Sequence, residues 1–222
     1  MDPTKSFRLA RILKGVAKSQ KGKGKLRPIR LGLLEKMLMQ LGNTASPYLQ
    51  TLMKAILLVT YHGCFRIGEV VLSGKNEHYM KMENISFIYK NNAIYCLKVR
   101  LPTFKHSKHA VSIKIRTVTS RPCPVMALVE YLKVRGDSPG PVFRKEDGDQ
   151  VNRAFVASHI KRILKEMGKN ECDYNTHSIR SGRTTDMLVK GVPEHLIKRT
   201  GRWRTEAFES YIRIEEFTVP GV

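Results

Sequence analysis

The stretch THSIRSGR, residues 176–183, places His177 and Arg180 three positions apart in a segment that reads as the start of a helix. Side chains at positions i and i+3 of a helix lie on one face. A neutral imidazole can accept a proton and a guanidinium can grip an anion, so the pair could form half of an anion site. Two unrelated polar side chains on a basic helix would give the same sequence, so the rest of the chain must decide between an anion site and a chance pair.

A second arginine stands in an apolar context. In YHGCFRIGEVVLS, residues 61–73, Arg66 and Glu69 interrupt a stretch that would otherwise be entirely core. An ion pair that caps a helix explains this pattern as well as a functional site does.

Three further side chains could take part in chemistry. Lys105 lies in PTFKHSKHA, and the only tryptophan, Trp203, precedes Tyr211 by eight residues in GRWRTEAFESYIR. Taken alone, the lysine reads as a solvated side chain, the tryptophan as a core anchor and the tyrosine as a surface aromatic. The set is more informative than its members.

Composition favours a globular protein that binds a polyanion. The chain has 222 residues, 41% of them hydrophobic, and its 40 Lys+Arg against 19 Asp+Glu give a formal net charge of +21. That charge is typical of nucleic-acid binders, although a surface for anionic membranes or an excess of solvated lysines would also produce it. The longest apolar run is AILLV at 55–59, so we expect neither a membrane span nor a signal peptide, and an intracellular location.

Cysteine and histidine patterns indicate no metal centre. The four cysteines are far apart and form no CxxC pair, so we expect reduced, mostly buried thiols. His106 and His109 have a metal-compatible spacing, but no cysteine or carboxylate lies beside them to complete a coordination shell.

The elements that must position these residues follow from periodicity. The first thirty residues hold ten Lys+Arg against one acid, and the Gly/Lys-rich connector ends at Pro28, where a compact unit begins. Helical spacing predicts a helix beginning near Leu34 and a second, mostly buried helix over 47–61. From residue 125 onward the pattern is helical again, and a last helix is expected from about Thr205.

Between the helical regions the period changes to two. Apolar residues alternate with charged ones over 97–101 and 111–116, and with the segment 84–90 they predict a small antiparallel sheet of about three strands. The hairpin between the last two strands carries Lys105 at its tip. The expected fold class is therefore α+β, mainly α, with one small three-stranded antiparallel sheet.

The polar set and its order resemble the tyrosine recombinases, the phage-integrase-like family. GCFRIGEV resembles that family's GxxRxGE motif, THSIR its HxxR motif, GRW its His-or-Trp position, and ESYIR its tyrosine. The resemblance covers about residues 28–215. The GRW and YIR sequences are most similar to those of recombinases of eukaryotic DIRS-type and Crypton-type mobile elements.

The resemblance implies the catalytic-domain fold of that family, and DNA cleavage and rejoining through a covalent 3′-phosphotyrosyl intermediate. Tyr211 would be the nucleophile, Arg66 and Arg180 the phosphate clamp, and Glu69 a supporting acid. His177 would assist proton transfer, and Trp203 would donate its indole N–H. Lys105 would be the general acid, and Lys108 is close enough to compete for that role.

Elementary chemistry agrees with these roles. Guanidinium groups stabilise the charge that develops on phosphate oxygens in the transition state. Tyrosine has an ordinary pKa of ~10, so about one molecule in a thousand is ionised at pH 7 and the nucleophile needs positive charge or a base nearby. The phosphotyrosine bond stores the energy for rejoining, so neither a metal nor a nucleotide cofactor is expected.

The resemblance also sets expectations for domains and partners. Residues 1–27 would be a basic arm, the remnant of an amino-terminal core-binding region, and residues 28–222 the catalytic domain. Double-stranded DNA is the expected partner, with self-association on DNA, and the location would be nuclear in a eukaryotic host. Eleven residues follow Tyr211, so we expect a shortened segment for docking on a neighbouring protomer.

Two other functions stay open. A non-catalytic DNA-binding protein derived from a mobile-element recombinase would keep the fold and the charge without cleaving DNA. A type IB topoisomerase would share the chemistry and rejoin the same strand, but the short chain and the lack of a coiled linker disfavour it.

Overall fold

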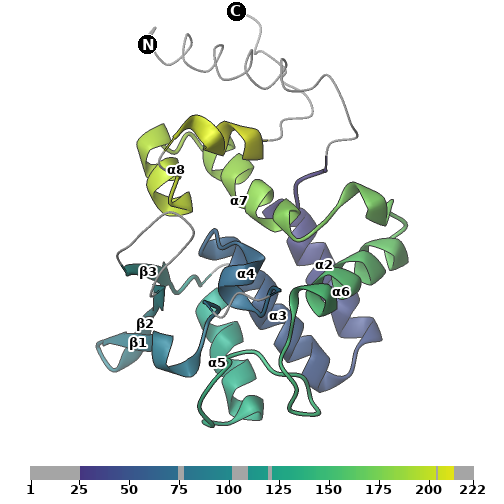
Figure 1. Ribbon diagram of the computed structural model, residues 1–222, viewed down its shortest axis with the longest axis vertical. Coiled ribbons are helices and arrows are strands. Elements are labelled where there is room, and N and C mark those ends of the chain that lie inside the picture. The colour runs from purple at the N-terminus through teal and green to yellow at the C-terminus, as the bar shows by residue number, and fades with distance from the viewer. Residues whose placement is uncertain (1–25, 75–77, 102–109, 120–121, 204, 213–222) are drawn as a thin grey trace, which may run out of the picture.

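The computed structural model describes residues 26–74, 78–101, 110–119, 122–203 and 205–212. Helices surround a central helix, and a small sheet lies at one side of the molecule (Figure 1). The α-helices are α2 (Leu31–Thr44), α3 (Pro47–His62), α4 (Ile67–Val70), α5 (Pro124–Arg135), α6 (Arg153–Glu166), α7 (His177–Val189) and α8 (Glu194–Gly201). Short 3-10 helices are η1 (Met82–Asn84), η2 (Glu171–Asp173) and η3 (Glu206–Tyr211).

The central helix is α3. Its start is fixed by Ser46, whose hydroxyl accepts a hydrogen bond from the backbone N–H of Leu49, and by Pro47 at the first helical position. All residues from Leu52 to Tyr61 except Lys54 are buried, and α2, α5 and α7 pack around them. The helix predicted over 47–61 is confirmed.

The sheet has the order β1 (Ile85–Lys90), β2 (Ala93–Leu101) and β3 (Val111–Arg116), with antiparallel pairing throughout. Asn91 and Asn92 join β1 to β2 with φ of 51° and 58°, the left-handed backbone of a two-residue hairpin turn that asparagine tolerates. Leu97, Val99 and Leu101 are buried, as their alternation predicted. The mainly helical fold with a three-stranded antiparallel sheet is thus confirmed.

A second, smaller apolar cluster holds the carboxy-terminal part of the described chain. Its buried members come from the turn after α3, from α7, from α8 and from η3: Cys64, Met187, Ile197, Phe208 and Ile212. The final helix expected from about Thr205 is a 3-10 helix over Glu206–Tyr211, begun by the Thr205 hydroxyl, which accepts from the N–H of Ala207. Phe208 and Ile212 thereby fix the place of Tyr211 between them.

Two composition-based expectations can be compared with the fold. Cys64 and Cys96 are buried thiols, but Cys123 is half-buried and Cys172 is exposed, so only part of the cysteine prediction holds. Within the described ranges, no helix is long and apolar enough to cross a membrane.

Candidate active site

Helix α7 presents two faces with different tasks. His177 is its first residue, and the backbone N–H of His177 donates to the side-chain oxygen of Asn175, at 2.8 Å. Arg180, one turn further along, faces the turn after α3 and the end of α8. On another face, Ser178, Gly182 and Asp186 are spaced four residues apart and receive the incoming chain.

That incoming chain, residues 26–31, runs along α7. The N–H of Ile29 donates to the carbonyl of Ser178, at 2.8 Å, and a Cβ on Gly182 would lie 1.8 Å from the carbonyl oxygen of Ile29. Asp186 accepts from the backbone N–H of Leu31, from Arg30 and from the hydroxyl of Tyr61. Burial opposes the ionised carboxylate, yet these hydrogen bonds lower the pKa of Asp186 below its ordinary value. The contacts fix the position of α7, and with it His177 and Arg180.

Arg180 is fully buried at the centre of the site. Two of its N–H groups donate to the carbonyl oxygens of Cys64, at 2.6 Å, and Gly201, at 2.5 Å. Its Cζ lies 4.3 Å from the ring centre of Trp203 and 5.3 Å from that of Tyr211. Burial lowers its pKa to about 10, which leaves the guanidinium charged at neutral pH.

The Cys64 carbonyl points into the site because the chain turns sharply after α3. Cys64 adopts a left-handed backbone with φ of 48°, and Gly63 before it has no room for a side chain, since a Cβ there would lie 2.1 Å from the Phe65 ring. The Cys64 oxygen accepts from Arg180 and, at 3.2 Å, from Arg202. One turn thus orients two arginines.

Glu69 joins Arg66 to Arg202. Its carboxylate accepts from the backbone N–H of Arg66 at 2.8 Å, from the Arg66 guanidinium at 3.2 Å and from that of Arg202 at 2.6 Å. The helix-capping pair considered from the sequence is therefore present at the start of α4, and it also belongs to the site. The side chain of Arg202 is 5% exposed, so this is a buried ion pair.

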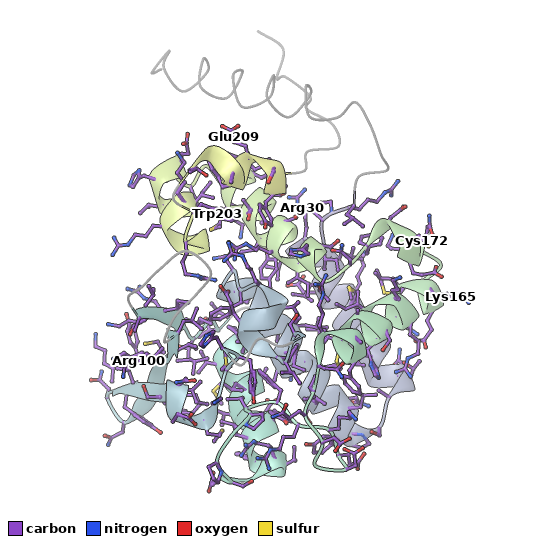
Figure 2. All side chains as sticks on the ribbon, viewed as in Figure 1. Arg30, Arg100, Lys165, Cys172, Trp203 and Glu209 are labelled. Atoms are coloured by element: carbon purple, nitrogen blue, oxygen red, sulfur yellow. The ribbon has the colours of Figure 1, made fainter. Side chains whose placement is uncertain are left out.

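The GRW stretch is explained by close packing. A Cβ on Gly201 would lie 1.6 Å from the indole of Trp203, so only glycine lets the ring fold back over the end of α8. Arg202 provides the left-handed residue, φ 61°, that makes this reversal. The ring centres of Trp203 and Tyr211 are 5.2 Å apart. Trp203, labelled in Figure 2, lies at the end of the molecule where α7 and α8 meet.

His177 is half-buried beside the arginines. Burial lowers its pKa, and the charges of Arg153, Arg180 and Arg66 lower it further, so the imidazole is neutral at pH 7. A neutral imidazole can accept a proton.

The structure brings together most of the residues singled out in the sequence, namely Arg66, Glu69, His177, Arg180, Trp203 and Tyr211. Lys105 and Lys108, with His106 and His109, lie outside the described residues. Sequence reasoning missed Arg202. Its signal was available in the GRW stretch, but its partner Glu69 is 133 residues away in sequence.

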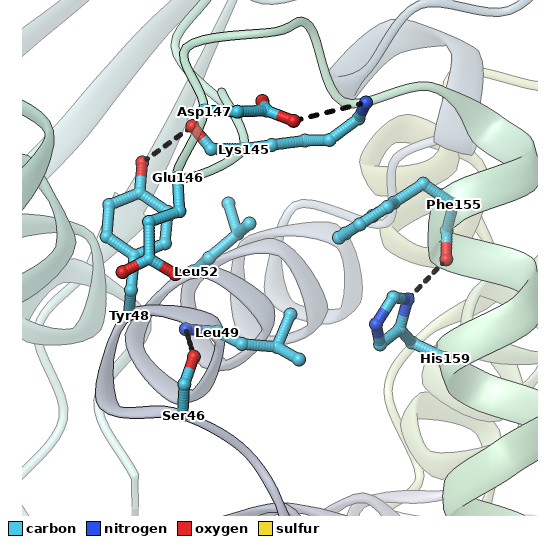
Figure 3. A pocket seen from close by; sticks show the side chains of 9 residues that line it. All are labelled: Ser46, Tyr48, Leu49, Leu52, Lys145, Glu146, Asp147, Phe155 and His159. Atoms are coloured by element: carbon cyan, nitrogen blue, oxygen red, sulfur yellow. Dashed lines mark hydrogen bonds and ion pairs between the residues drawn. The ribbon is translucent and has the colours of Figure 1, made fainter.

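No cluster of three or more metal-ligating side chains occurs in the described ranges. A pocket of about 510 Å³ lies elsewhere, between the start of α3, the Lys145–Asp147 turn and α6 (Figure 3). Tyr48, Phe155 and His159 are among its lining residues, and none of the candidate active-site residues Arg66, Glu69, His177, Arg180, Arg202, Trp203 and Tyr211 contributes to it.

Comparison with known proteins decides the family. The model of the phage integrase family matches residues 33–213. The chain belongs to the phage integrase family. A search of curated proteins gave no match.

Solved structures of this family share the fold at low sequence identity. A XerH site-specific recombinase bound to a palindromic difH substrate, in a post-cleavage complex, is 13% identical with a TM-score of 0.65, over 88% of this chain and 51% of that one. A lambda integrase dimer bound to a COC′ core site is 12% identical with a TM-score of 0.63, over 91% of this chain and 53% of that one. The Tn1549 transposon integrase in complex with transposon right-end DNA is 14% identical with a TM-score of 0.56, over 87% and 64%. The chain spans about half the length of the first two.

Proposed function

We propose that this phage integrase family member cleaves and rejoins DNA, with Tyr211 as nucleophile and Arg66 and Arg180 as the phosphate clamp. The observation that carries the proposal is a group of buried N–H donors with no acceptor in the described part of the chain: Nε of Arg180, Nε of Arg202 and Nε1 of Trp203. Buried donors are normally paired, so an anionic acceptor such as a phosphate would complete this site. Two of these donors lie beside the Tyr211 ring.

The reaction has two halves, cleavage and rejoining. Each half breaks one ester bond to phosphorus and forms another, so the number of such bonds does not change. The Tyr211 oxygen bonds to phosphorus as its proton passes to the neutral imidazole of His177, and the bond from phosphorus to the 5′ oxygen breaks. Lys105 gives that oxygen a proton, leaving a 3′-phosphotyrosyl bond and a 5′ hydroxyl. Attack by a 5′ hydroxyl reverses these steps and releases the tyrosine.

The arginines act on the charge that develops during attack. Arg180 is held by two carbonyls before substrate arrives, so no reorganisation energy is needed to orient it. The Glu69 carboxylate likewise orients the Arg66 guanidinium before substrate arrives, by accepting a hydrogen bond from it. Because the Tyr211 ring covers the Arg180 guanidinium, a phosphate that reaches the guanidinium from that side displaces the ring and places tyrosine and phosphate next to each other.

Covalent trapping with nicked DNA tests the proposal. Wild-type protein should form an adduct that survives a denaturing gel, and Tyr211→Phe should bind DNA equally well and form none. An adduct with Tyr211→Phe would assign the nucleophile to another residue. Tight binding with no adduct in either protein would favour the non-catalytic DNA-binding alternative.

The identity of the general acid needs a second substrate. With sulfur in place of the leaving 5′ oxygen, the leaving group is a thiolate whose conjugate acid has a pKa of ~8.5, so it departs without a proton. We expect Lys105→Ala to cleave ordinary DNA at least about a hundredfold more slowly and to recover on the sulfur substrate. If Lys108→Ala shows this rescue and Lys105→Ala does not, Lys108 is the acid.

We propose four further features on the strength of the sequence. The GRW and YIR sequences support placing this chain among the recombinases of DIRS-type or Crypton-type elements. Residues 1–27 would be a basic arm, the remnant of a core-binding region, before a catalytic domain over 28–222. The partner would be double-stranded DNA, on which copies of the chain associate. The site of action would be intracellular, and nuclear in a eukaryotic host.

A further inference from the structure

The outward face of the sheet carries a compact group of cations. Side chains alternate between the two faces of a strand, so the residues between the buried Leu97, Val99 and Leu101 point outward. The pairing register places Lys98 directly opposite Lys114. The charged residues of β2 and β3 on this face, called here the sheet cations, are Lys98, Arg100, Lys114 and Arg116.

The sheet cations are not paired with acidic side chains in the described part of the chain. None forms an ion pair or a hydrogen bond with an acid among the residues that the structure describes, and all but Lys98 are exposed. Cations elsewhere on the surface do have acidic partners, such as Lys54 with Glu130 and Arg162 with Glu166. Like charges directly opposite each other destabilise a sheet, so the Lys98–Lys114 pair opposes folding unless something neutralises it.

We propose that the sheet cations bind the phosphate backbone of duplex DNA outside the segment held at the candidate active site. Neighbouring strands are ~4.8 Å apart and alternate residues of a strand ~6.8 Å apart, so the four cations span roughly 14 Å along the strands. One strand of B-DNA rises ~3.4 Å per phosphate, so that span covers about four phosphates. The surface thus fits a short run of backbone.

This surface is distinct from the site around Arg180. Arg100 lies at the sheet side of the molecule, well apart from Trp203 (Figure 2). A single phosphate at the site cannot reach both. The proposal rests on the proposed function only for the identity of the partner, and it assigns the sheet a role in holding flanking DNA.

The formal charge of +21 favours DNA over an acidic protein surface, because cations spread over the chain find a continuous partner in a polyphosphate. Contacts of this kind give affinity without base readout. Each neutralised phosphate adds about −0.9 to the slope of log binding constant against log salt concentration. Loss of the sheet cations should therefore be measurable as a shallower salt dependence of DNA binding.

The test compares two variants of equal net charge in binding to a fluorescent duplex over a series of salt concentrations. In the first, Lys98, Arg100, Lys114 and Arg116 are changed to Gln. In the matched control, four exposed lysines of α5 and of α6 and its following turn are changed to Gln: Lys133, Lys161, Lys165 and Lys169. Lys165 lies on the opposite side of the molecule from Arg100 (Figure 2).

We expect the sheet variant to lose about 3 to 4 units of salt slope and at least about tenfold in affinity, and the control to lose much less. Equal losses would show a general charge effect and overturn the proposal. An unchanged sheet variant would also overturn it, and would leave an acidic protein as the partner of this face. Covalent trapping at saturating protein, run in parallel, reports on the proposed function separately, because the sheet variant should form the wild-type amount of adduct.

Discussion

At the scale of single residues, the carbonyl oxygen of Cys64 joins the two buried arginines of the site. Arg180 and Arg202 both donate to it, and Arg202 continues through Glu69 to Arg66. Like-charged guanidiniums are thereby held close together by one carboxylate and by backbone oxygens. Such an arrangement favours an incoming anion, because the positive charge exceeds the negative charge that orients it.

Arg202 is the residue whose loss should show most clearly as instability. Changing Arg202 to Gln removes one partner of the buried Glu69, which keeps only Arg66, so we expect a loss of about 2–4 kcal/mol in the free energy of unfolding. Urea denaturation measures it. Arg199→Gln, at an exposed position three residues earlier, serves as control and should change stability by less than about 0.5 kcal/mol. Equal stability of the two variants would contradict a structural role for the Glu69–Arg202 pair.

His62 predicts a pH dependence of stability. Burial, with the charges of Arg183 and Lys190, lowers its pKa from 6.5 to about 4. Between these values the unfolded chain binds a proton that the folded chain does not, so stability should fall by about 3 kcal/mol as the pH drops from about 6.5 to about 4. His62→Gln should remove most of this loss, and the exposed His195→Gln should not. Denaturation midpoints across that pH range would refute the account if both variants kept the wild-type slope.

At the scale of elements, the contact between residues 26–31 and α7 sets the position of the site. Gly182 lies against the backbone of Ile29, so Gly182→Ala forces the incoming chain away from the helix, at a cost of about 1–3 kcal/mol. Gly42→Ala in α2 meets nothing within 4 Å and should be neutral or stabilising by up to about 1 kcal/mol. Chemical denaturation of the two variants distinguishes them. A Gly182→Ala protein as stable as Gly42→Ala would mean that the incoming chain does not press on α7.

The elements themselves were largely predictable from the sequence. Leu97, Val99 and Leu101 alternate with charges, and α3 is mostly apolar from Leu52 to Tyr61, so strand and buried helix follow from period and length. The structure of the final described segment, Glu206–Tyr211, was harder to predict. Phe208 and Ile212 have helical spacing, but the segment is a short 3-10 helix because its position is set by packing against Cys64 and Met187, which are distant in sequence. The role of Arg202 was hidden for the same reason, because local spacing carries no information about a contact with Glu69.

At the scale of the whole molecule, the site lies where chain segments from both ends of the described sequence meet. The turn after α3, α7 and the segment from α8 to η3 form it, residues 26–31 hold α7 from its other face, and the sheet lies to one side (Figure 1). Charge is distributed more widely, and the sheet cations place part of it away from the site. Chemistry and DNA holding are therefore expected to be separable by mutation.

The proposed mechanism depends on attack of the Tyr211 hydroxyl on a DNA phosphate. The most direct measurement is peptide mass spectrometry of the protein–DNA adduct after nuclease digestion. We expect a nucleotide remnant on the peptide that contains Tyr211, joined through a 3′ phosphate. A remnant on any other residue, or none although the duplex is cleaved, would contradict it.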